Sequence, residues 1–316
     1  MTEYPSGMPD NQTPSPEKPG DGFQSQSPFG TSRPIISEPE HASSWIMKII
    51  SDTVKGFIHS PFHICIAAVV LVIPVIFTSE IDFSKLMAVD SKGMFDFTYL
   101  QEHGSDLALT MILVLFANSV AYSLAYRWAN YMRLGKSLSL GGYLEGLASV
   151  PRVLFGLVFE IGIMTAALLV TAPVFLLVAL SKLFMMVGFM VFFGVLIYLI
   201  LKWAPKFDYF IAGLGITDEP FSVLLHEWWA MPKWLWRRFL ALMAIRILAL
   251  LVSIIITLPL SVALKNSQYV NLIPNFLIDI VGLIYIASTA VAFARGRDEW
   301  AEQTIELEAE TEKAGT

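Results

Sequence analysis

The chain has 316 residues, of which 55% are hydrophobic and only 15% are charged, and its mean hydropathy is +0.61. This composition excludes an ordinary soluble domain and favours a protein that spans a membrane. The net charge of −6 does not indicate a basic partner, because seven of the acidic residues fall in the last segment, 298–316.

Residues 1–42 are polar and contain eight prolines, and they hold too little apolar surface to fold by themselves. We expect a disordered cytoplasmic tail there, and no cleavable signal peptide. Cys65, the one cysteine of the chain, lies inside an apolar segment. Intrachain disulfides and cysteine-rich metal sites are therefore excluded.

Six apolar segments follow, each near or above the length of about 20 residues that a helix needs to cross the hydrocarbon core. The sequence therefore predicts an all-α fold, a polytopic membrane bundle of six transmembrane helices within residues 43–295. Residues 296–316 are expected to form an acidic cytoplasmic tail that continues the last span as a helix. The predicted spans are residues 61–78, 106–126, 153–180, 183–203, 235–264 and 272–293.

The basic residues indicate which side of the membrane each connection occupies. Thirteen of them flank the spans on the side that includes both termini, and four lie on the other side. All eight tryptophans belong to the more basic side, where indole rings favour the headgroup boundary. Because cytoplasmic connections carry the excess of Lys and Arg, we expect both termini in the cytoplasm and the chain in a bacterial inner membrane.

Two parts of the sequence resemble one another. The second and fourth spans end in RWANYM and KWAPKF, and each is followed by apolar residues at helical spacing, within 140–147 and 221–228. Each segment then reaches a proline and a basic residue, at Pro151 and Pro232, before a long span. The pattern predicts two cytoplasmic-side amphipathic interfacial helices within a parallel repeat, although two independent amphipathic segments would also produce it.

Residues 201–242, LKWAPKFDYFIAGLGITDEPFSVLLHEWWAMPKWLWRRFLAL, combine a span, an amphipathic segment that ends in Trp and basic residues, and the next span. In this arrangement the chain resembles the six-span membrane domain of the glycerophosphodiester phosphodiesterase membrane-domain-like superfamily, over residues 45–295. The resemblance implies the six-span fold. It implies no phosphodiesterase activity, because this sequence has no counterpart of the soluble catalytic domain and the membrane portion of the family carries no catalytic residues.

Polar side chains inside the spans are candidate functional residues, because a charge in the bilayer costs about 2.5 to 3.5 kcal/mol on insertion scales. They are Asn118, Glu160, Arg246 and Asp279. The first three fall at a similar depth and are expected to form one cluster, whereas Asp279 lies deeper. The cluster would serve either as a polar pathway or anion site with Arg246 as donor, or as a structural ion pair that fixes helix register.

A second set of residues is expected to anchor lipid headgroups at the cytoplasmic boundary, where Trp and basic side chains meet. The stretch PKWLWRR belongs to this set, so nucleic acid is not expected as a partner. His59 and His63 are separated by Pro61, and neither a metal site, a cofactor nor a catalytic motif is expected. The expected anchors are Trp228, Trp229, Lys233, Trp234, Trp236, Arg237, Arg238, Arg127 and Arg152.

We therefore expect a non-catalytic membrane protein that organises lipid or serves as an accessory subunit of a membrane complex. Its expected partners are membrane lipids, another membrane protein or a second copy of itself. A small transporter for a lipid or amphiphilic solute is the alternative, based on the repeat and the polar cluster. An enzyme comes third.

Overall fold

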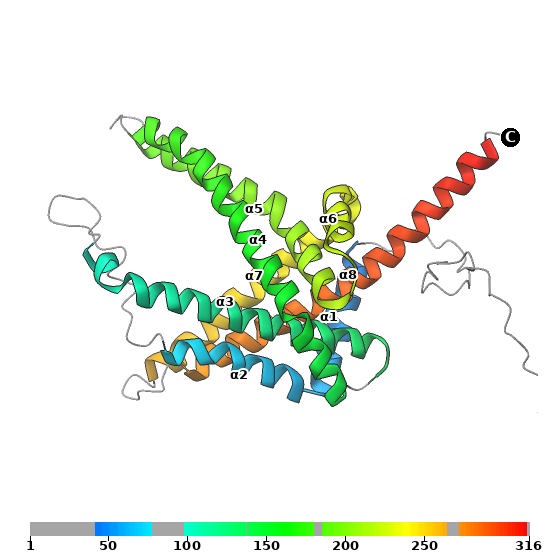
Figure 1. Cartoon of the computed structure of the whole chain (residues 1–316), viewed down its shortest axis with the longest axis horizontal. Coiled ribbons are helices and arrows are strands. Elements are labelled where there is room, and N and C mark those ends of the chain that lie inside the picture. The colour runs from blue at the N-terminus through cyan, green and yellow to red at the C-terminus, as the bar shows by residue number, and fades with distance from the viewer. Residues whose placement is uncertain (1–41, 78–97, 137, 180–184, 264–271, 315–316) are drawn as a thin grey trace, which may run out of the picture. The chain divides into compact units, whose positions relative to one another are not determined.

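The computed structural model describes residues 42–77, 98–136, 138–179, 185–263 and 272–314, and within these ranges it consists of helices and short turns (Figure 1). The predicted N-terminal tail, residues 1–42, lies outside the described residues except for Ala42, which begins the first helix. The helices are α1 (Ala42–His59), α2 (Phe62–Phe77), α3 (Thr98–Arg133), α4 (Leu140–Ala179), α5 (Met185–Ile216), α6 (Phe221–Ala230), α7 (Lys233–Ala263) and α8 (Leu272–Ala314).

Four of the described helices are long and apolar enough to cross a membrane, in the segments Gln101–Arg133, Leu140–Val170, Lys233–Thr257 and Leu272–Lys313. The broken pair Ser43–His59 and Phe62–Pro74, bent by 91°, raises the number to five if the pair forms one span. These helices are consistent with the predicted all-α, multi-pass membrane protein, without establishing the predicted number of six. The last of them continues through the acidic segment after residue 296, as expected.

The prediction omits α1, because its first apolar segment begins at residue 61. α1 is amphipathic: Trp45 and Ile49 are buried, whereas Met47 and Lys48 are exposed. It packs against α7 and α8. Pro61 lacks an amide hydrogen and stands where the chain turns by 91° into α2. The structure thus contains an amphipathic helix that hydropathy alone does not reveal.

The two predicted amphipathic helices differ from one another. The second is the separate helix α6, whose apolar side chains Leu224 and Trp228 are buried in the bundle. The first is not separate, because residues 140–147 form the opening turns of α4, which continues through Pro151. A proline inside a packed helix bends it without ending it. The chain breaks instead before α7, where Pro232 directly precedes the first helical residue.

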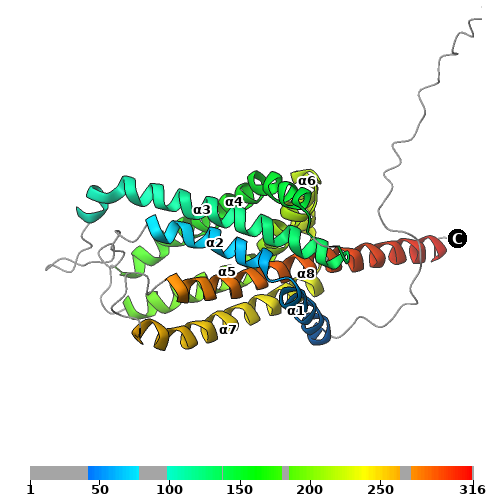
Figure 2. The ribbon, with the colours of Figure 1, turned by 90° about the horizontal axis from the view of Figure 1, so that it is seen from below.

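Helix α8 lies among the other long helices and contacts α1, α2, α3, α5 and α7 (Figure 2). Small side chains line these contacts: Ala121, Ala125 and Ala129 recur at four-residue intervals on α3 and are buried. On α8, Ala287 and Ala290 are also buried. Close approach of helix backbones through small residues is what holds helices together in a bilayer, where the surrounding lipid is as apolar as the side chains.

Gly215 of α5 is one such point of close approach. A Cβ atom added there would overlap the ring of Tyr126 on α3, which is 1% exposed. Gly215→Val is therefore expected to lower the free energy of unfolding by about 1 to 3 kcal/mol through overpacking. Gly194 lies on the same helix with no atom within 4 Å of an added Cβ, so Gly194→Val is the matched control. Thermal unfolding in one detergent checks both, and equal melting temperatures would contradict the prediction.

Candidate functional site

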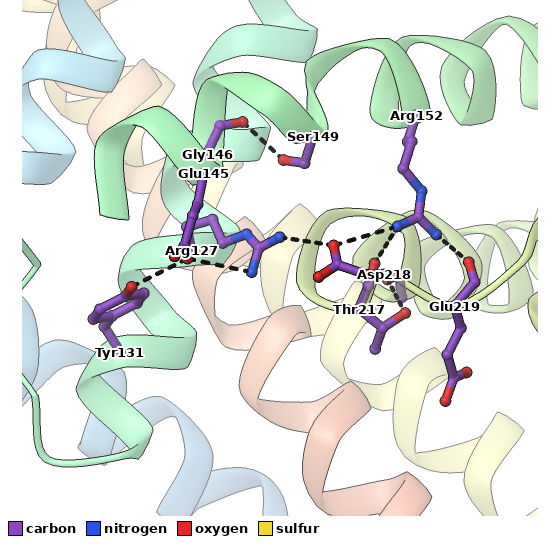
Figure 3. Close-up of polar contacts among 10 residues, drawn as sticks. Arg127, Tyr131, Glu145, Gly146, Ser149, Arg152, Thr217, Asp218 and Glu219 are labelled. Carbon is purple, nitrogen blue, oxygen red and sulfur yellow. Dashed lines mark hydrogen bonds and ion pairs between the residues drawn. The ribbon is translucent and has the colours of Figure 1, made fainter. Parts of the chain in front are cut away.

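Charged side chains from several helices meet where α3 passes into α4 and α5 into α6 (Figure 3). The guanidinium of Arg127 on α3 lies 3.3 Å from Oδ1 of Asp218 and 3.8 Å from Oε2 of Glu145. Tyr131, one turn further along α3, donates a hydrogen bond to Glu145 at 3.1 Å. These contacts join the end of α3 both to the start of α4 and to the connection between α5 and α6.

Arg152 of α4 binds the same connection (Figure 3). Its guanidinium donates hydrogen bonds to the main-chain carbonyls of Thr217 and Glu219 and lies 3.8 Å from Oδ1 of Asp218. Because α5 ends at Ile216, these carbonyls belong to the turn that leaves a helix C-terminus, where a cation is favourable. Arg152 therefore fixes the path of the chain from α5 into α6.

Arg297 of α8 holds α6 from the other side. Its Nη2 atom lies 2.5 Å from Oε2 of Glu219 and 2.7 Å from Oε1 of Glu227, and its Nε donates to Glu227 at 3.0 Å. The hydroxyl of Tyr209 on α5 donates to the second oxygen of Glu227, also at 3.0 Å. Nε and Nη2 both donate to the same oxygen of Glu227, and such charge-assisted hydrogen bonds are stronger than those between neutral groups. Helix α6 is thus tied to both α5 and α8.

Arg238 of α7 is buried between two indole rings, with its guanidinium carbon 4.7 Å from the Trp45 ring centre and 4.8 Å from that of Trp234. It forms an ion pair with Glu299 of α8, and Nε1 of Trp45 donates to the same carboxylate at 2.7 Å. These contacts bind α1 to α7 and α8. The polar collar, as we call the charged residues of these networks, comprises Arg127, Glu145, Arg152, Asp218, Glu219, Glu227, Arg238, Arg297 and Glu299.

The polar collar changes the interpretation of several predicted lipid anchors. Trp228 is 4% exposed and packs within an aromatic cluster, and Arg238 is 5% exposed, so neither has a surface to offer a headgroup. Arg127 and Arg152 are engaged by carboxylates and carbonyls of the protein. Of the remaining predicted anchors, Trp234 and Trp236 are half-buried, and the exposed ones are Trp229, Lys233 and Arg237.

The structure brings Glu160 and Arg246 into one interior cluster. The guanidinium carbon of Arg246 lies 4.7 Å from the ring centre of Tyr285, whose hydroxyl donates to Asp208 at 2.5 Å. Tyr122 of α3 lies close enough to Arg246 for the two side chains to interact. Glu160 lies close enough for its charge to interact with both Asp208 and Arg246. Helices α3, α4, α5, α7 and α8 each contribute one of these five polar side chains.

The other two predicted residues of the interior stand apart from this cluster. The side-chain amide of Asn118 donates to the carbonyl of Val114, one turn earlier in its own helix, at 2.8 Å. Asp279 is half-buried on α8, nearly two turns before Tyr285. Among the described residues, no hydrogen bond or ion pair joins either of them to Arg246.

The prediction omits Asp208, because it ends the fourth span at residue 203. α5 instead runs to Ile216 and carries Asp208 into the bundle. A pattern that would have identified it is the run FDYFIAGLGI, residues 207–216, in which Asp208 is the single charge among apolar and small residues. An isolated charge in such a run indicates a buried partner.

No family model, curated protein or solved structure matches this chain significantly. The superfamily resemblance of residues 201–242 thus stays a prediction. The geometry of the polar collar and of the interior cluster carries the functional argument.

Proposed function

We propose that this chain is a non-catalytic integral protein of a bacterial inner membrane that interacts with lipid, as an organiser of the bilayer or as an accessory subunit of a membrane complex. The observation that supports it best is an apolar face left uncovered at the level of the polar collar. Leu140, Leu144 and Leu147, on the opening turns of α4, are 78%, 61% and 47% exposed. They lie on one helical face and flank Glu145, which belongs to the polar collar.

An apolar face beside a charged ring fits the boundary between acyl chains and headgroups, where amphipathic helices bind. The contacts of Arg127 with Glu145 hold this face at a fixed place on the bundle. We propose six spans with both termini in the cytoplasm. α2 and α5 supply the spans beyond the four long apolar helices, and the basic residues of the connections support the orientation.

The lipid surface is tested by changing the exposed leucines. In native nanodiscs the wild-type protein is expected to carry a lipid composition different from that of the whole membrane. The double change Leu140→Ser and Leu144→Ser is expected to reduce this difference by about half or more, because each exposed leucine that is removed loses apolar contact with lipid. Lipid mass spectrometry of purified discs makes the measurement.

Ile305→Ser is the matched control, because Ile305 is 66% exposed on α8 beyond the apolar segment. An equal effect of this control would contradict the assignment of the lipid surface to α4. A stoichiometric protein in the discs would support the accessory subunit. Discs with bulk lipid composition and no protein partner would overturn the proposal.

A small transporter for a lipid or amphiphile is the second candidate. It is favoured by the interior cluster, in which Arg246, Asp208 and Tyr285 place polar groups of three helices inside the bundle. Ionisable groups inside a membrane domain commonly mark the pathway of a substrate. The same discs discriminate the two candidates. A lipid retained after repeated detergent exchange would indicate a binding place in the interior.

A further inference from the structure

A cavity of about 550 Å³ lies between α1, α3 and α8. Its volume falls within the range of about 300 to 1,000 Å³ typical of small-molecule sites. Three helices direct polar groups to its wall, and most of these groups are basic. They are Asp52, Lys55 and His59 of α1, Arg133 of α3 and Arg295 of α8.

The charges of the cavity wall favour an anion. Arg133 is paired with Asp298 at 3.3 Å, and Asp52 supplies a second carboxylate. Against these two negative charges stand three positive ones, on Lys55, Arg133 and Arg295, so the net charge is +1. A ligand that carries negative charge would be drawn to Lys55 and Arg295 rather than to the paired Arg133.

Arg295 carries a guanidinium whose donors are not all paired within the protein. Its Nη1 atom is buried and has no hydrogen-bond partner in the part of the chain that the structure describes. A buried donor without an acceptor is costly, and a guanidinium normally engages carboxylate or phosphate through such donors. Nη1 itself is closed to solvent, so an anion in the cavity would meet the part of the Arg295 side chain that lines it.

Helices α1 and α3, which carry two parts of the cavity wall, each pack against α8, which carries the third. At Gly56 of α1, one residue after Lys55, an added Cβ atom would overlap the sulfur of Met132 on α3. The Met132 side chain thus lies against α1 beside Lys55, and Lys55 and Arg295 are carried by α1 and α8, which are in contact. Groups held on packed helices are positioned more precisely than groups on loops.

We infer that this cavity binds a phosphate group, with Lys55 and Arg295 as its donors. Ile58 and Phe62, at the bend between α1 and α2 beside His59, are 73% and 67% exposed and offer an apolar surface to an acyl chain. A phospholipid with an anionic headgroup is thus the expected source of the phosphate. Because the ligand would come from the membrane, this inference rests on the proposed function.

Titration of the full-length protein in detergent micelles tests the site, with native mass spectrometry as the readout. The three ligands are short-chain phosphatidylglycerol, phosphatidylcholine and inorganic phosphate. We expect phosphatidylglycerol to bind more tightly than phosphatidylcholine, and Lys55→Gln and Arg295→Gln each to weaken it about tenfold, as loss of one charge-assisted hydrogen bond does. Lys48→Gln is the matched control, because Lys48 is exposed on the same helix outside the cavity.

The possible outcomes distinguish failure of the phosphate site from failure of the proposed lipid role. Unchanged binding in Lys55→Gln and Arg295→Gln, or an equal loss in Lys48→Gln, would overturn the site while leaving the lipid role to the nanodisc measurement. Binding of inorganic phosphate that depends on Lys55, without binding of phosphatidylglycerol, would support a phosphate site but assign it to a soluble ligand, against the lipid source. If Arg295→Gln lowers the folded yield, Lys55→Gln, at an exposed position, decides alone.

Discussion

Arg246→Met is expected to lower the free energy of unfolding by about 1 to 3 kcal/mol, because it leaves partly buried carboxylates without their neighbouring cation. The change takes away the cation that lies near Asp208 and Glu160 and that interacts with Tyr122. The carboxylates would then lie in the bundle without a compensating charge. Chemical or thermal unfolding in a single detergent measures the loss.

Two further variants test the explanation. Arg237→Met removes an exposed arginine of the same helix and is expected to change the stability little. Asp208→Asn combined with Arg246→Met is expected to recover part of the loss, because the double change removes both charges. If the double variant were as unstable as the sum of the two single changes, the interaction between Arg246 and Asp208 would contribute nothing to the fold.

Trp45→Ala is expected to destabilise the packing of α1 by about 3 to 5 kcal/mol, the range for truncating a buried tryptophan. Trp45 is fully buried, stacks on Arg238 and donates to Glu299, so the change leaves a cavity and removes one hydrogen bond from that carboxylate. The expected result is faster hydrogen exchange in α1 and faster proteolysis within residues 42–59.

Trp229→Ala provides the comparison, because Trp229 is 70% exposed. Its removal is expected to leave the exchange of α1 unchanged. Equal exchange rates in α1 for the wild type and Trp45→Ala would show that α1 is held to the bundle by other contacts.

The positions of most helices could be predicted from local sequence. A helix that crosses the hydrocarbon core needs about 20 apolar residues, and its internal hydrogen bonds satisfy its backbone groups. Segments such as 106–126 and 272–293 have this composition. α1 could not be found in this way. Its apolar residues occupy one face, so its mean hydropathy is low, and only contact with α7 and α8 buries them.

Part of the interior cluster could also be predicted from local sequence. Glu160 and Arg246 stand out because each is a charge within an apolar span. Asp208 is also an isolated charge, but the predicted fourth span ends before it. Tyr285 does not stand out, since its importance follows from its position between Arg246 and Asp208, which belong to α7 and α5. A pairing between distant helices depends on how they are packed, and composition does not contain it.

Composition and charge thus predict a helical membrane protein, the places of most of its apolar helices and two members of its interior cluster, because insertion into a bilayer acts on each segment separately. Whether Trp228 and Leu144 are buried or exposed depends on packing. Both lie on amphipathic segments that look alike in the sequence, yet Trp228 is buried by aromatic neighbours whereas Leu144 is 61% exposed. Burial is a property of the neighbours that surround a side chain, and those neighbours come from helices far away along the chain.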